Sequence, residues 1–130
     1  MEILQPRGWS RPKGYSNGVA AIGKTIHVAG MIGWDRQERF TASDLPGQVR
    51  QALTNVVEVL AEAGAGPEHI VRMTWYVIDR KEYLIEAQSI GAIYREIIGR
   101  HFPAMTAVQV SALIEDQARV EIEVTAVIPA

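Results

Sequence analysis

Cysteine is absent from the 130-residue sequence. This absence excludes disulfide bonds, a cysteine nucleophile and thiolate metal ligands. The apolar runs are far shorter than the roughly 18 residues that suggest a membrane-spanning helix. Residues 1–11 also lack the apolar stretch of a secretory signal. We therefore expect a cytoplasmic protein that has no membrane partner.

An excess of basic residues is also missing. The chain has 13 Lys and Arg against 15 Asp and Glu, which gives a net charge of −2. Such a chain is poorly suited to neutralise a phosphate backbone, so we expect no nucleic-acid partner. Hydrophobic residues make up 48% and charged residues 22%, which are ordinary globular values. We expect one domain over residues 1–130.

Two common kinds of catalytic motif are lacking as well. His27, His69 and His101 do not stand at a spacing that matches a metal motif, so we expect no metal site. No serine lies in a G-x-S-x-G setting, which argues against a serine nucleophile with a histidine base.

The first half of the chain predicts an arm, a hairpin and a helix. Residues 1–14 are rich in proline and glycine and predict an irregular arm. The apolar residues 19–22 and 25–31 predict two strands of a hairpin, with a turn at Gly23-Lys24. Apolar residues then recur at helical spacing over 45–63, after a capping Ser43 or Asp44 and before Gly64.

The second half predicts strands over 70–78, 105–113 and 119–128, with a helix over 82–98 that Gly99 ends. The predicted order is β-β-α-β-α-β-β. The predicted fold class is therefore α+β, with a mixed β-sheet and two helices packed on one face, because that arrangement buries both apolar helix stripes. The other face of the sheet is then free for a partner or a ligand.

Glu121 and Glu123 fall on one face of the last predicted strand, because side chains alternate along a strand. Either both carboxylates point to solvent, or Glu121 projects into a pocket and positions a water as a general base. Tyr15 and Trp34 lie in irregular segments. Each is either a ligand wall or an anchor that holds its loop on the core.

Six segments, in order along the chain, resemble the Rid (YjgF/RidA-like) superfamily. They are Gly14-Tyr15-Ser16, HVAGMI at 27–32, QVRQALTNV at 48–56, the strand 71–79, FPAMTAV at 102–108 and VEIE at 120–123. The resemblance implies a chorismate-mutase-like fold. It also implies a homotrimer with small-molecule ligands in clefts between subunits.

The resemblance further implies a reaction. Well-studied members of this superfamily hydrolyse reactive imines and enamines to a keto acid and ammonia, without a cofactor or a metal. In them a tyrosine, matched here by Tyr15, lines the pocket. A glutamate of the last strand, matched by Glu121, helps to place the attacking water. The residue after the pocket Thr or Ser, often cysteine in the family, is Ala107 here.

The sequence departs from the family at the residue that holds the substrate. Where the family has an arginine after FPA, this chain has Met105, and the family's glutamine near residue 31 is Met31. A charge-assisted hydrogen bond of this kind contributes about 1.5–3 kcal/mol. The chain therefore resembles an Arg-lacking branch. We expect its substrate to differ from the usual small 2-imino acid, because Met31, Trp34 and Met105 give an apolar lining.

Several alternatives remain open at this stage. The chain is either a deaminase of a reactive enamine or imine or a non-catalytic binder of small molecules, and 2-aminomuconate deaminases of aromatic degradation are a further model. Other cations could hold an acid group, and Arg7, Arg11 and Lys13 of the arm are candidates. Alternatively, the arm lies solvated on the surface.

Overall fold

Six strands, three α-helices and one 3₁₀ helix make up the computed structural model, which describes residues 1–130. In chain order these elements are β1 (Glu2–Leu4), β2 (Gly18–Ala20), β3 (Gly23–Ile32), α1 (Leu45–Glu62), η1 (Pro67–His69), β4 (Ile70–Val77), α2 (Arg80–Ile85), α3 (Ala87–Ile97), β5 (Ala104–Gln109) and β6 (Val120–Pro129). None of the helices combines the length and apolar composition that crossing a bilayer requires.

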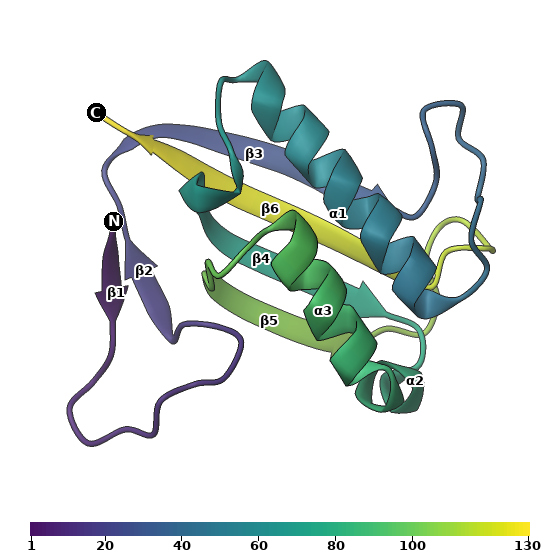
Figure 1. Cartoon of the computed structure of the whole chain (residues 1–130), viewed down its shortest axis with the longest axis horizontal. Coiled ribbons are helices and arrows are strands. Elements are labelled where there is room, and N and C mark those ends of the chain that lie inside the picture. The colour runs from purple at the N-terminus through teal and green to yellow at the C-terminus, as the bar shows by residue number, and fades with distance from the viewer.

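The main sheet has the strand order β3-β6-β4-β5. The strands β4 and β5 are parallel, whereas β6 runs antiparallel to both β3 and β4. Helices α1 and α3 lie side by side across one face of this sheet (Figure 1). The predicted α+β class, with a mixed sheet and helices on one face, is therefore confirmed.

Helix α1 forms where the sequence predicts it. The Asp44 side chain accepts a hydrogen bond from the backbone N–H of Gly47 at 3.1 Å and so caps the helix. Pro46 lies in the first turn, where a missing N–H costs nothing. Gly64 adopts a φ of 73° directly after the helix, a conformation that favours glycine.

Strand β6 lies between β3 and β4 and has two different faces. Val120, Ile122 and Val124 are buried under the helices. Glu121 and Glu123 point to the opposite face, which no helix covers. This uncovered face is called the open face below. Strands β3 and β5 form the two edges of the sheet. Within the chain, Ser16 bridges to the start of β5, and no other strand pairs with either edge.

The predicted hairpin of residues 19–31 is wrong. Strand β2 pairs with β1, and β3 pairs with β6. Gly23 is not a turn residue but the first residue of β3, opposite Pro129, where a Cβ would overlap the backbone oxygen of Ile128. The glycine thus permits a close approach of two strands. The strand β1 also shows that the arm is not irregular throughout.

The predicted helix 82–98 is two helices. Asp79 starts α2 two residues earlier, because its carboxylate accepts from the N–H groups of Lys81 and Glu82 at 3.0 and 3.1 Å. The chain then breaks at Glu86, so Leu84 and Ile85 stay largely exposed. Two charge-assisted hydrogen bonds from Arg119 to Glu82, both 2.9 Å, fix α2 against the start of β6. This tertiary contact gives α2 a separate position from α3.

Candidate active site

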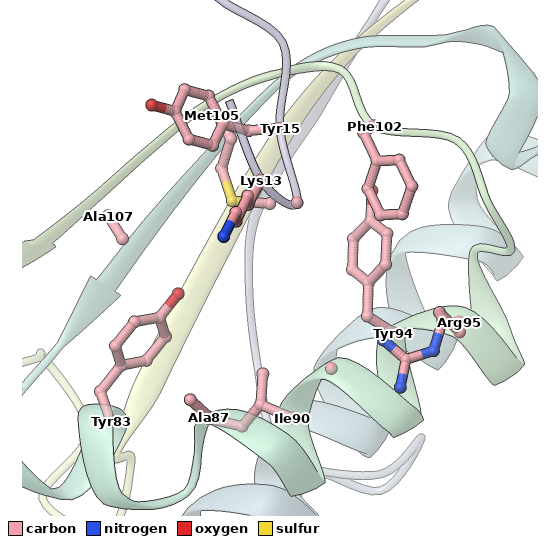
Figure 2. A pocket seen from close by; sticks show the side chains of 12 residues that line it. Lys13, Tyr15, Tyr83, Ala87, Ile90, Tyr94, Arg95, Phe102, Met105 and Ala107 are labelled. Atoms are coloured by element: carbon pink, nitrogen blue, oxygen red, sulfur yellow. The ribbon is translucent and has the colours of Figure 1, made fainter. Parts of the chain in front are cut away.

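A cleft of about 440 Å³ lies between β5, the pair α2–α3 and the end of the N-terminal arm. Its volume falls within the roughly 300–1,000 Å³ of small-molecule sites. Figure 2 shows side chains from all three segments around it. The walls are mainly apolar and aromatic.

Three predicted site residues, Tyr15, Met105 and Ala107, line this cleft together. Ser16 brings the arm to β5. Its N–H donates to the backbone oxygen of Pro103 at 2.9 Å, and its buried hydroxyl donates to that of Phe102. Tyr15 is thereby held beside the start of β5, where residue 105 lies.

The helix side of the cleft is aromatic. Tyr94 stacks on Phe102 with a centroid distance of 5.8 Å, and its hydroxyl donates to the backbone oxygen of His101 at 2.6 Å. Tyr83 packs edge-on against the buried Trp75 at 6.3 Å. Burial raises the pKa of both Tyr83 and Tyr94 above the usual tyrosine range. Both hydroxyls are therefore neutral donors at pH 7.

Lys13 and Arg95 are the charged residues of the cleft, and no Asp or Glu lines it. Neither cation forms an ion pair within the chain. Figure 2 shows the Lys13 amine pointing into the cleft, while the Arg95 guanidinium lies towards the Tyr94 and Phe102 end. The cleft is therefore positively charged, although the whole chain has a net charge of −2.

Glu121 does not reach this cleft within one chain. Met105 is paired with Met73, whose buried side chain faces the helices, so Met105 faces the helices as well. Glu121 is paired with Tyr76 and lies on the open face. Its carboxylate lies over Gly30, where a Cβ would overlap it. The two residues thus point to opposite sides of the sheet.

Met31 and Trp34 line a different hollow, between the end of β3 and helix α1. Trp34 packs on Phe40 at a centroid distance of 5.9 Å. The Asn55 side chain donates to the backbone oxygens of Ile32 and Trp34 at 3.1 and 2.9 Å. These contacts hold the loop to α1. Within one chain, Met31 and Trp34 are therefore separate from Tyr15 and Met105.

The fold and the cleft can now be compared with known proteins. Residues 9–128 match the family model described as endoribonuclease L-PSP. The match covers nearly the whole chain, and similar solved structures are described as Rid proteins. The chain belongs to the Rid superfamily.

Relatives of this Rid chain include a named enzyme. The human 2-iminobutanoate/2-iminopropanoate deaminase is 31% identical over 114 residues, which cover 87% of this chain and 79% of the human protein. Among solved structures, the Rid protein YyfB of Yersinia pestis, described as of unknown function, has a TM-score of 0.86 at 31% identity and covers 98% of both chains. Escherichia coli TdcF with bound serine has a TM-score of 0.69 at 28% identity and also covers 98% of both chains.

Sequence reasoning missed the helix side of the Rid cleft. The sequence places Tyr83, Tyr94 and Arg95 in a predicted helix and Phe102 in a motif, but their convergence depends on how α2 and α3 pack over β5. One signal was present. Tyr83, Ala87 and Tyr94 recur at spacings of four and seven, which places them on one helical stripe, but such a stripe usually faces the core.

Proposed function

We propose that this Rid protein is a hydrolytic deaminase that converts a reactive enamine or imine to a keto compound and ammonia. The observation that carries the proposal is the cleft in which Tyr15, Met105 and Ala107 meet. The name of the human relative, a 2-imino acid deaminase, supports the reaction class.

The proposed reaction needs only water and proton transfers. An enamine first tautomerises to an imine by moving a proton from nitrogen to carbon. Water then adds to the imine carbon, and a carboxylate takes a proton from this water as it attacks. The nitrogen receives a proton, the carbon–nitrogen bond breaks and ammonia leaves as the carbonyl forms. We assign the carboxylate to Glu121 and propose no cofactor or metal.

This assignment requires a second subunit, because Glu121 lies on the open face and the cleft lies on the other side of the sheet. We propose a homotrimer in which the open face of one subunit lies against the cleft of the next. The uncovered face and the largely unpaired edges β3 and β5 support assembly, since such edges are normally covered. Met31 and Trp34 line the hollow between the end of edge strand β3 and helix α1, and we propose them as ligand contacts from that second subunit.

The proposed substrate is not the usual small 2-imino acid. Met105 supplies no positive charge where the family arginine holds a carboxylate, and it makes that part of the cleft apolar and polarisable. An enamine or imine with a larger apolar body fits this lining. The larger enamine acids handled by 2-aminomuconate deaminases are an alternative class.

A second candidate is a non-catalytic binder that uses the same cleft. The observation that favours it is the separation of Glu121 from Met105 within the chain. A cleft without a nearby carboxylate can bind a ligand but has no base to activate water.

Ammonia release distinguishes the two candidates. The purified protein is mixed with enamines generated in place from small and from aromatic or conjugated amino acids, and ammonia is measured against the uncatalysed rate. For a deaminase we expect faster release, and Glu121→Gln should lower the rate by about 10²–10⁴-fold, as expected for loss of a general base. Glu123→Gln removes a carboxylate from the same face and serves as the control.

Two results would contradict the deaminase. Ammonia release at the uncatalysed rate with every enamine would favour the binder. Full activity in a folded Glu121→Gln protein would remove Glu121 from the mechanism.

A further inference from the structure

The cleft lacks the family arginine but still contains positively charged side chains. Lys13 and Arg95 line it without any acidic neighbour in the lining and without an ion pair in the chain. Two unpaired cations around an apolar hollow therefore favour an anionic ligand.

Lys13 reaches the cleft because the local backbone turns it inward. Gly14 adopts a φ of 79°, a left-handed conformation that residues with a side chain rarely adopt. This turn lets the side chains of Lys13 and Tyr15, on either side of it, line the same cleft. The hydrogen bonds of Ser16 to Phe102 and Pro103 then hold the segment in place. The arm is thus tied to β5 next to Met105.

Tyr83 faces Lys13 from the opposite wall. Its ring is held by the edge-on contact with Trp75, and Figure 2 shows its hydroxyl pointing towards the Lys13 amine. Burial raises the pKa of Tyr83, so the hydroxyl keeps its proton at neutral pH. None of the hydrogen bonds within the chain uses this hydroxyl, so it is available as a donor.

We propose that the Lys13 ammonium and the Tyr83 hydroxyl together hold the carboxylate of the ligand, in place of an arginine at position 105. An ammonium and a hydroxyl from opposite walls can each donate to one carboxylate oxygen. The inference rests on the proposed function only in taking this cleft as the ligand site. It names a specificity-determining pair that the family motif does not contain.

The body of the ligand follows from the remaining lining. Ile90, Phe102 and Met105 form an apolar surface, and the volume of about 440 Å³ exceeds what a three- or four-carbon acid fills. Flat aromatic and polarisable side chains favour a planar, unsaturated body. The ligand class is therefore a carboxylic acid with an aromatic or conjugated body.

Calorimetric titration of the assembled protein tests this directly, with phenylacetate, acetate and the neutral phenylacetamide as probes. We expect phenylacetate to bind at least tenfold more tightly than acetate, because acetate lacks the apolar body. Lys13→Gln should weaken phenylacetate binding by about tenfold, the usual effect of losing one charge-assisted hydrogen bond, and should leave phenylacetamide binding unchanged. Lys13→Arg should largely restore the affinity.

Tyr83→Phe should weaken phenylacetate binding by a smaller factor of about two to ten and leave phenylacetamide unchanged. Lys24→Gln is the matched control, because it removes the same charge from an exposed lysine of β3 that does not line the cleft. The inference is overturned if Lys13→Gln binds phenylacetate as wild type does, if acetate binds as tightly as phenylacetate, or if no probe binds.

These titrations need no turnover. If no enamine releases ammonia but phenylacetate binding depends on Lys13, the proposed deaminase is wrong and the carboxylate site stands. If ammonia is released from aromatic enamine acids and Lys13→Gln leaves both phenylacetate affinity and KM unchanged, the deaminase stands and the assignment of Lys13 is wrong.

Discussion

Met105 is the residue at which this chain departs most clearly from the family pattern, and it lines the cleft beside Tyr15. A guanidinium at this position can form a two-pronged pair with a carboxylate, which a thioether cannot. Within one chain no acidic residue lines the cleft to pair with such a guanidinium, and in the proposed trimer the only carboxylate brought to it is Glu121 of the next subunit.

We predict that Met105→Arg raises kcat/KM for 2-iminopropanoate by roughly tenfold or more, since one charge-assisted hydrogen bond contributes about 1.5–3 kcal/mol. Ammonia release from freshly generated imine measures the change, and Met105→Gln controls for size without charge. A folded Met105→Arg protein with no gain, beside a wild type that already turns over small imino acids rapidly, would show that another residue does the work of the arginine.

At the scale of single residues, three residues predicted for the site from family motifs, Tyr15, Met105 and Ala107, line one cleft. Within one chain Met31, Trp34 and Glu121 do not line it, and contact of any of the six with a ligand stays a prediction. The roles proposed for Lys13 and Tyr83 could not be predicted from the sequence. Lys13 was one of three candidate cations in the arm, and only the positive φ of Gly14 and the anchoring of Ser16 single it out. Tyr83 depends on the position of α2.

At the scale of elements, the strongest patterns were the most reliable. The alternation of β6 and the caps of α1 are local properties, and the structure confirms both. The predicted hairpin is wrong because strand pairing also depends on segments that are distant in the sequence. Residues 18–20 pair with β1 rather than with β3. The break at Glu86 also has no proline or glycine to mark it, and it follows from the contact of α2 with Arg119.

Tyr94 connects α3 to the turn before β5 and makes the stability of this layer sensitive to high pH. Its hydroxyl donates to the His101 backbone oxygen, and burial raises its pKa above the usual value of about 10. Above pH 10 the unfolded tyrosine loses its proton while the native one keeps it, so the native state binds more protons. The free energy of unfolding must then fall as the pH rises.

We therefore predict that the ionisation of Tyr94 leaves the free energy of unfolding unchanged below pH 10 and lowers it from pH 10 upward. The raised pKa of Tyr83 acts in the same direction. Urea unfolding at pH 8 and pH 11 measures the effect. Tyr94→Phe should be less stable at pH 8 by about 1–2 kcal/mol, because the His101 oxygen loses its donor. It should also lose less stability between the two pH values than wild type. An equal loss in both proteins would contradict this role of Tyr94.

At the scale of the whole molecule, the sheet separates the two halves of the proposed site. The register places Met105 on the helix side and Glu121 on the open side. A sequence can predict that residues within one strand share a face, but it cannot predict how two strands pair. The cleft between subunits that we expect from the sequence therefore stays a prediction. If Glu121 is the base, the geometry of one chain requires such a shared cleft.

Mixing two inactive variants tests whether the site is shared. Ala107→Trp fills the cleft of a subunit but leaves its Glu121 intact, whereas Glu121→Gln removes the base but leaves the cleft open. Both homotrimers should release ammonia far more slowly than wild type. When the two are unfolded together in equal amounts and refolded, a cleft and a base from different subunits meet intact in roughly one site in four by chance.

We predict that the mixture recovers about a quarter of the wild-type activity per site, with native mass spectrometry confirming mixed trimers. Refolding the two variants separately and then combining them is the control. We expect this recovery because each variant keeps one intact half of the site, either the cleft or Glu121. The symmetric assembly then brings an intact cleft and an intact Glu121 together from different chains. Mixed trimers without any recovered activity would mean that cleft and base belong to one subunit, and a monomer in solution would exclude a shared site altogether.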